Sequence, residues 1–262
     1  MKSRTLASIP LLLALAFGLK AQLPAPNAAG VSMGHLHLNT SDPAAQRAFW
    51  TTLGGTPTKL GDMEVIKFPD VLILYRKVDP SGGTEGSVVG HVGLRVKDLH
   101  ASLEKWSAAG IKIVPGGNPH QAFVIAPGEV RVEITEDPAM EAPIANHHIH
   151  FYTASVDETK AWYVKTFGAK PGKRGPFEAA DLPGVNLTFS KADAAVAGTK
   201  GRALDHIGFE VKDLEAFCKK LEADGVKFDI PFRKIPALGI SIAFLTDPWG
   251  TYIELTEGMN RL

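Results

Sequence analysis

Apolar and polar residues alternate along four separate stretches of the chain, and each stretch carries a histidine near its start. These histidines, spaced 56, 57 and 58 residues apart, are His35, His91, His148 and His206. After each one comes a run with apolar residues at helical spacing, and then short runs that alternate again. A period of two predicts a strand and a period of 3.6 predicts a helix. The pattern therefore predicts an α+β fold of four βαβββ units, each containing one helix.

The elements are clearest in the second and fourth units. In the second unit we expect a helix over about Leu99–Ala109 and strands at residues 111–114, 121–126 and 130–135. In the fourth unit the corresponding strands fall at residues 226–230, 241–246 and 252–256. These runs are short and are separated by turn residues, which is typical of strands and not of further helices.

Each expected helix carries a bulky residue fifteen positions after the histidine and stops at a glycine. The bulky residues are Trp50, Trp106, Tyr163 and Leu221. The glycine follows the histidine by 20 residues in the first and third units and by 19 in the second and fourth, at Gly55, Gly168, Gly110 and Gly225. Glycine readily adopts the left-handed conformation in which many helices end, so we expect these positions to end the helices.

The four units follow an A-B-A-B order. Residues 91–113 and 206–228 are identical at 11 of 23 positions, whereas the first and third units share an HxH motif, His35/His37 and His148/His150. The chain is therefore expected to be a duplicated two-unit domain. We place the boundary near the proline-containing segment 141–144, giving domains at residues 31–143 and 144–262.

The N-terminus has the features of an export signal. Lys2 and Arg4 precede a mostly apolar run from Thr5 to Leu19, and a small residue, Ala21, offers a cleavage point. We expect a signal peptide at residues 1–21, a tether at residues 22–30, and a periplasmic or extracellular protein without a membrane anchor once the signal is removed. The alternative is an uncleaved anchor, although the run is shorter than the ~20 residues that span a bilayer.

The composition limits the classes of partner that the protein can be expected to bind. Lys plus Arg and Asp plus Glu both number 28, so there is no basic excess for nucleic acid or an anionic membrane surface. We therefore expect a small-molecule partner, and no nucleic acid. The single cysteine, Cys218, lies beside Phe217 in a helical run, where buried packing is expected instead of catalysis.

Four histidines in one register point to metal chemistry. A single histidine at a strand edge has a bland explanation, but packing does not require imidazole at the same place four times, and histidine is the commonest metal ligand. The last strands of the second and fourth units add Glu133 and Glu254 among apolar residues. By the period of two, these carboxylates face opposite to their apolar neighbours. The alternative is that both glutamates are solvated on the outer face of a sheet.

Together these features resemble the vicinal-oxygen-chelate superfamily, and the closing segment 247–255 (DPWGTYIEL) is the most specific of them. The superfamily includes glyoxalase I, extradiol dioxygenases, methylmalonyl-CoA epimerase, and fosfomycin- or bleomycin-resistance proteins. The resemblance spans about residues 31–260. It implies that two units form a cup-like, incompletely closed β-barrel around a divalent metal. The ligands that it implies here are His35, His91, His148, His206, Glu133 and Glu254.

In this superfamily glyoxalase I-like sites use two carboxylates, but the first and third units here have Leu74 and Thr188 at the glutamate position. Each half thus offers two histidines and one glutamate, the set of non-haem Fe(II) oxygenases. This favours Fe(II), with Mn, Zn or Ni as alternatives. In extradiol dioxygenases the site lies in the third and fourth units, which would select His148, His206 and Glu254.

The chain departs from those dioxygenases at their proton-handling residues. They usually carry a tyrosine ten residues before the ligand glutamate and a histidine earlier still. Here Phe244 takes the tyrosine position, and residues 226–262 contain no histidine. His37 and His150, on the same strand face as the presumed ligands, are the candidate acid–base residues. They are equally compatible with a supporting or core role.

Two pairings of the units remain open at this stage. Sequential pairing groups His35, His91 and Glu133 in one site, and His148, His206 and Glu254 in the other. Pairing of outer with inner units instead groups His35, His206 and Glu254, and His91, His148 and Glu133.

In either case we expect an exported, metal-dependent enzyme of dioxygenase or glyoxalase/lyase type that acts on a small vicinally oxygenated substrate. The alternative is a non-catalytic binding protein of the bleomycin-resistance type.

Overall fold

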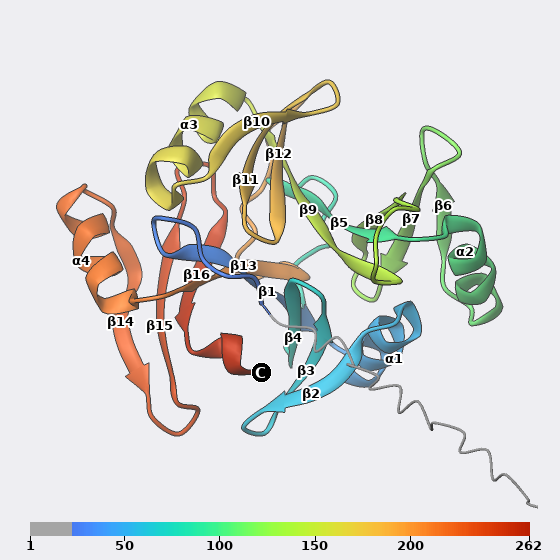
Figure 1. Cartoon of the computed structure of the whole chain (residues 1–262), viewed down its shortest axis with the longest axis horizontal. Helices are drawn as coiled ribbons and strands as arrows, with labels where there is room; N and C mark the ends of the chain where they lie inside the picture. The colour runs from blue at the N-terminus through green and yellow to red at the C-terminus, as the bar shows by residue number, and fades with distance from the viewer. Residues whose placement is uncertain (1–22) are drawn as a thin grey trace, which may run out of the picture.

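The computed structural model describes residues 23–262, and the expected signal peptide lies outside them. It contains four helices, which cover the sheets from outside (Figure 1): α1 (Pro43–Leu53), α2 (Leu99–Ala108), α3 (Val156–Phe167) and α4 (Leu214–Ala223). A short 3₁₀ helix, η1 (Met259–Arg261), ends the chain. Within residues 23–262, none of the helices is long and apolar enough to cross a membrane.

The sixteen strands confirm four βαβββ units. The first two units contain β1 (Val31–Thr40), β2 (Thr56–Leu60), β3 (Met63–Phe68), β4 (Val71–Lys77), β5 (Val89–Val96), β6 (Ile113–Pro115), β7 (Gln121–Ala126) and β8 (Val130–Glu136). The last two contain β9 (Ile144–Thr153), β10 (Lys170–Arg174), β11 (Phe177–Leu182), β12 (Val185–Lys191), β13 (Leu204–Val211), β14 (Phe228–Ile235), β15 (Ile240–Thr246) and β16 (Tyr252–Glu257). Each unit supplies a first strand, one helix and three further strands.

The strands form two open eight-stranded sheets, and outer units pair with each other, as do inner units. One sheet has the order β14-β15-β16-β13-β1-β4-β3-β2, and the other has the order β10-β11-β12-β9-β5-β8-β7-β6. The joints are the antiparallel pairs β1–β13 and β5–β9. The division at residue 143 therefore does not coincide with the sheets, because each sheet takes one unit from either side of it.

The outer-unit sheet is curved, so that its two ends approach each other on the concave face. Side chains from its two ends meet in an apolar cluster that includes Leu60 and Leu74 from one half and Ile240 and Ile242 from the other. The convex faces pack on the helices in a larger core that runs through both sheets. Each sheet therefore has a helix-covered side and an open side, and the histidine clusters described below lie on the open side.

The helices form where the sequence predicts them. The bulky residues Trp50, Trp106, Tyr163 and Leu221 are all buried in the core. Asp42, Asp98 and Asp213 cap the N-termini of α1, α2 and α4 by accepting a backbone N–H, which satisfies a donor that the helix itself leaves unpaired.

Left-handed glycines end the helices, with one correction to the prediction. Gly168 caps α3, and Gly110 and Gly225 lie just past α2 and α4 with positive φ. In α1, however, the left-handed residue is Gly54, with φ of 117°. Gly55 was the expected stop, but it lies beyond the cap and packs against Ile66 and Phe68. The pair of adjacent glycines made the two roles indistinguishable by spacing alone.

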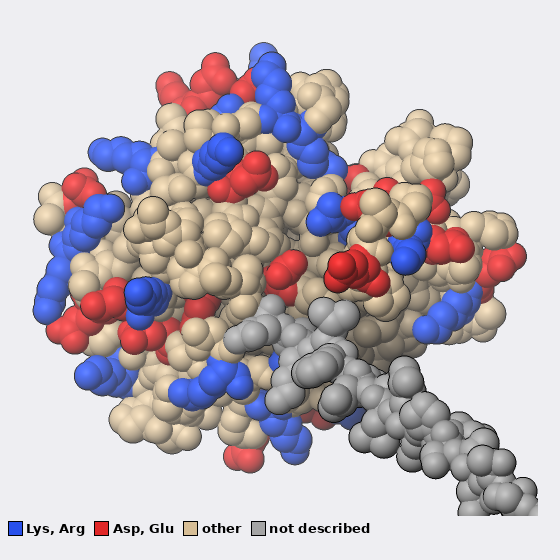
Figure 2. Space-filling view, viewed as in Figure 1, with Lys and Arg blue, Asp and Glu red and all other residues tan. Residues whose placement is uncertain are grey.

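Residues 23–30 lie against the folded part of the chain. Leu23 is buried, and the Asn27 amide donates to the carbonyls of Phe167 and Gly168 at the end of α3. Cys218 is buried in α4, and burial raises the pKa of its thiol to about 12, so it stays protonated at neutral pH. Acidic and basic side chains are interspersed over the face shown in Figure 2, in keeping with the net charge of zero.

Candidate metal centre

The outer-unit sheet gathers three histidines and one glutamate at its centre. His35 and His37 come from β1, His206 from β13 and Glu254 from β16, and one ligand atom from each lies within 4.8 Å of the others. All four residues are buried. The Nε2 atoms of His35 and His206 both lie 2.9 Å from Oε2 of Glu254. We refer to these four residues as the outer cluster.

Strand register brings these residues together. His35 pairs with Gly208 on β13, and Gly208 pairs with Glu254 on β16, so the three residues form a row across three strands. A Cβ at Gly208 would lie 2.1 Å from the His35 ring. The missing side chain is therefore what lets the imidazole cross the central strand and reach the carboxylate.

The geometry of the outer cluster fits a divalent metal. Two ligand atoms bound at about 2.1 Å and at right angles lie about 3.0 Å apart, close to the 2.9 Å between the carboxylate oxygen and each imidazole nitrogen. Nε2 of His37 is buried and has no hydrogen-bond partner within the described residues. A buried polar atom without a partner is costly, and a metal-bound species would relieve it. Two imidazoles and a carboxylate suit Fe(II), Mn, Ni or Zn.

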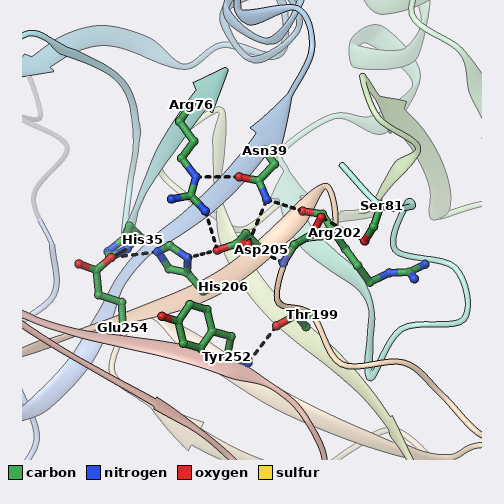
Figure 3. A network of polar contacts seen from close by, with 11 residues as sticks. His35, Asn39, Arg76, Ser81, Thr199, Arg202, Asp205, His206, Tyr252 and Glu254 are labelled. Atoms are coloured by element: carbon green, nitrogen blue, oxygen red, sulfur yellow. Dashed lines mark hydrogen bonds and ion pairs between the residues drawn. The ribbon is translucent and has the colours of Figure 1, made fainter. Parts of the chain in front are cut away.

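Asp205 contacts the ring nitrogen of His206 that does not face Glu254 (Figure 3). Its Oδ2 lies 2.7 Å from Nδ1 of His206, and its Oδ1 accepts from the Asn39 amide and the Gly201 backbone N–H. Arg76 donates to Asn39 and lies 3.5 Å from the Asp205 carboxylate. A carboxylate bound to one nitrogen of a histidine fixes its tautomer and orients the other nitrogen toward a metal.

The ionisable residues of the outer cluster shift one another's pKa values. Burial alone would raise the pKa of Glu254, but hydrogen bonds from His206 and His35 hold it well below its ordinary value. Burial alone would lower the pKa of His206, but Asp205 and Glu254 raise it. Burial and the neighbouring histidines lower the pKa of His37, so His37 is neutral. Nε2 of His206, which lies 2.9 Å from Glu254, is the atom that would bind a metal.

We predict that Asp205→Asn weakens metal binding by about 10- to 100-fold, the usual cost of losing such a supporting carboxylate. Asparagine keeps an acceptor for Asn39 and Gly201 but removes the charge behind His206. The measurement is a competition titration with a chelating dye. Asp229→Asn, at an exposed position in the same sheet, is the matched control. Equal affinities for the two variants would show that Asp205 does not support the site.

The inner-unit sheet contains a related set of residues, which we call the inner cluster: His91, Glu133, His148 and His150. Oε2 of Glu133 lies 2.8 Å from Nε2 of His91 and 3.4 Å from Nε2 of His148. Gly93 repeats the role of Gly208, since a Cβ there would lie 2.0 Å from the His148 ring.

Arg174 makes the inner cluster different. Its guanidinium lies 3.3 Å from Nε2 of His148 and 3.6 Å from Oε1 of Glu133. Burial, with Arg174 among the further causes, lowers the pKa of His148 to about 4 and that of His150 to about 2. Burial alone would raise the pKa of Glu133, but His148 and His91 hold it well below its ordinary value. Both histidines are thus neutral beside an ionised carboxylate.

The outer cluster lies at a cavity of about 560 Å³. Its walls are mainly apolar and come from β2 to β4 on one side and β14 to β16 on the other; they include Leu60, Leu74, Ile230, Ile242 and Phe244. Its exposed charged residues are all cations: Arg76, Lys200 and Arg233. The cavity can therefore hold an apolar body that carries a negative group.

The structure selects one of the two groupings left open by the sequence. His35, His206 and Glu254 lie together, as do His91, His148 and Glu133. The grouping of His148 with His206 and Glu254 is wrong, because β9 and β13 belong to different sheets. His37 and His150 each join a cluster. Sequence reasoning missed Asp205, Arg174 and the two cluster glycines, although the repeated H-x-G at 91–93 and 206–208 was a usable signal.

Residues 145–255 match the sequence profile of the Glyoxalase/Bleomycin resistance protein/Dioxygenase superfamily. No curated protein matches the sequence. Glyoxalase I from Zea mays has a similar fold, with a TM-score of 0.68 and 17% identity over 88% of this chain and 94% of that chain. A "putative dioxygenase" from Bacillus subtilis subsp. subtilis str. 168 gives a TM-score of 0.66 and 14% identity over 90% and 86%. The TM-scores show a shared fold, at sequence identities below 20%.

Proposed function

We propose that this chain, whose residues 145–255 match the profile of the Glyoxalase/Bleomycin resistance protein/Dioxygenase superfamily, is a metal-dependent enzyme with its active site at the outer cluster. The observation that carries the proposal is the arrangement of His35, His206 and Glu254 beside a cavity of about 560 Å³, with Nε2 of each histidine 2.9 Å from Oε2 of Glu254. Buried charges persist only when paired or bound to a metal, and this set suits a divalent cation.

A divalent metal held by these residues would polarise a substrate oxygen as a Lewis acid and favour loss of a proton beside a carbonyl. His37 is placed to take that proton. Its Nε2 is buried and has no hydrogen-bond partner among residues 23–262, and one of its ring nitrogens lies within 4.8 Å of the other ligand atoms of the cluster. The apolar cavity wall would keep water away while the proton moves from one substrate carbon to another. This chemistry is of the lyase or isomerase type.

The cavity indicates the class of substrate. The cavity of about 560 Å³ has mainly apolar walls, and His37, His206 and Glu254 of the outer cluster line it. Lys200 and Arg233 are exposed cations in the lining, and Lys200 lies 4.3 Å from the centre of the Tyr252 ring. We therefore propose a vicinally oxygenated small molecule with an apolar group and a carboxylate.

One observation favours a second candidate, oxygen-dependent ring cleavage. Two histidines with one glutamate leave positions open for substrate and O₂. Phe244 stands where those dioxygenases have a tyrosine, but Tyr252 lies in the same cavity with its ring 5.7 Å from that of His206. Burial raises the Tyr252 pKa to about 12, so its phenol keeps a proton to donate.

The test uses protein loaded in turn with Fe(II), Mn, Ni and Zn. Thiol–aldehyde adducts carrying a carboxylate are offered without oxygen, and catechols are offered in an oxygen electrode. We expect chelator-sensitive turnover of the adducts in the absence of oxygen, and a kcat/KM at least about 10-fold lower for the methyl ester of the same adduct. Oxygen uptake with catechols alone would favour the second candidate. Tight binding without turnover or metal would indicate a binding protein.

His37→Gln separates a proton carrier from a fourth metal ligand. If His37 carries the proton, the variant binds one equivalent of metal with unchanged affinity, and kcat falls by about 100- to 10,000-fold. Loss of metal together with activity would make His37 a ligand instead.

The chain is also proposed to be exported, because Lys2, Arg4 and the apolar run that follows form a signal-like N-terminus. Cell fractionation, with the mature N-terminus determined by sequencing, tests this directly. Full-length protein retained in the cytosol would contradict it.

A further inference from the structure

The inner cluster contains a cation of its own. Arg174, the last residue of β10, points its guanidinium at the atoms that would bind a metal there: 3.3 Å to Nε2 of His148 and 3.6 Å to Oε1 of Glu133. A guanidinium can only donate, so Nε2 of His148, which also lies 3.4 Å from Oε2 of Glu133, can accept from it and is then not available to a metal. The charge of Glu133 is balanced at the same time.

Thr188 holds Arg174 in place. Its hydroxyl oxygen accepts from Nε of Arg174 at 2.9 Å and donates to the Asn186 side chain at 2.6 Å. The arginine is therefore bound at both ends of its guanidinium, and its side chain is only 20% exposed. Neighbouring side chains therefore fix the position of Arg174, which is not a surface arginine that has folded over the cluster.

The outer-unit sheet has apolar residues at the same two positions. Residues 56–61 (TPTKLG) correspond to residues 170–175 (KPGKRG), which puts Leu60 in place of Arg174. Leu74 takes the place of Thr188, since each pairs with the second histidine of its HxH motif. The outer cluster consequently has no cation from β2 and no hydroxyl to hold one.

The residue that precedes the histidine of the second and fourth units differs as well. Asp205 precedes His206, whereas Gly90 precedes His91. A Cβ at Gly90 would lie 2.5 Å from the Tyr152 ring, so this aromatic ring fills the space that the outer cluster gives to a carboxylate. The inner cluster thus differs from a metal site in two independent ways.

We propose that Arg174 replaces the metal at the inner cluster, so that the chain binds one metal ion, at the outer cluster only. Two corresponding ligand sets then have different roles: one holds the metal, and the other holds the fixed guanidinium of Arg174. This proposal rests on the proposed metal site at the outer cluster.

The experiment is the metal-to-protein ratio, measured by elemental analysis and by calorimetric titration with Co²⁺ on the protein from residue 22 onward. We expect one equivalent for the wild type, two for Arg174→Leu, which reproduces the outer-cluster residue, and one for Arg174→Lys, which keeps a charge. Lys173→Leu, which removes the neighbouring exposed cation, is the matched control and should stay at one. Arg174→Gln serves if the leucine variant does not fold, and should also reach two.

The outcomes distinguish this proposal from the proposed function. Glu254→Gln should bind no metal, and Glu254→Gln with Arg174→Leu should bind one equivalent, at the inner cluster. Two equivalents in the wild type, or one in both Arg174→Leu and Arg174→Gln, would overturn the role of Arg174 and leave the outer site standing. No metal in any protein would overturn the proposed function itself.

Discussion

Glu254→Gln is expected to abolish metal binding and metal-dependent turnover. The single oxygen Oε2 of Glu254 faces both His35 and His206 at 2.9 Å, so it joins the two imidazoles and supplies the only carboxylate in the cluster. Glutamine has nearly the same shape but lacks the charge that attracts a divalent cation. Affinity should fall by more than about 100-fold, beyond the cost of losing a supporting residue. Equilibrium dialysis followed by elemental analysis measures it.

Glu133→Gln is the matched control for this change. It removes the corresponding carboxylate from the inner cluster, where Glu133 faces His91 and His148. We expect it to leave the metal content and the turnover of the outer site unchanged. Circular dichroism shows whether each variant is folded. A folded Glu254→Gln protein that retained its full metal content would refute the assignment of this ligand.

Gly208→Ala is expected to remove metal binding although it replaces none of the ligands. The added methyl would lie 2.1 Å from Cε1 and Nδ1 of His35, far inside van der Waals contact. His35 is fully buried between strands and must either leave its position or push β1 away from β13. Forcing extra volume into a packed interior costs about 1–3 kcal/mol. The variant should therefore have a lower free energy of unfolding and no tightly bound metal.

Gly172→Ala provides the comparison. Gly172 lies in strand β10, and a Cβ there would meet only an Asp181 carboxylate oxygen, at 3.8 Å. The free energy of unfolding and the metal affinity should both stay close to those of the wild type. Chemical denaturation and dye competition give the two quantities. Wild-type metal affinity in Gly208→Ala would mean that His35 does not bind through the position described.

Much of the fold could be predicted from periodicity and repetition. The buried residues Trp50, Trp106, Tyr163 and Leu221 fall where the fifteen-residue spacing places them, because one helix face must pack on a sheet. Strand β7 has the predicted bounds, Gln121–Ala126. The order of helices and strands depends on residues close together in the sequence, and the same order is repeated in each of the four units.

The pairing of units could not be predicted in this way. Whether β1 joins β5 or β13 depends on contacts between segments more than 150 residues apart, and the local pattern of β1 satisfies either partner. Strands β1 and β13 are buried on both faces, so no alternation of exposed and buried positions reveals their neighbours. The six ligand-type residues were therefore identifiable, but their grouping was not.

The supporting residues were missed for a different reason. Arg174 sits at the end of a short strand with an exposed pattern, where an arginine is unremarkable in sequence. Its role comes from side-chain contacts with Thr188, His148 and Glu133, which only the folded sheet brings within reach. Asp205 was visible beside His206, but a carboxylate next to a histidine in sequence points to the opposite face of a regular strand. The contact arises where the β1–β13 register shifts, next to His37 and Leu38.

The most direct test of the account is the metal content of the wild-type protein, purified from residue 22 onward without chelator and then loaded with Fe(II) or Mn. We expect one equivalent per chain, lost in Glu254→Gln and kept in Glu133→Gln. A wild-type protein that takes up no metal under any of these conditions would contradict the central claim that the outer cluster is a metal centre.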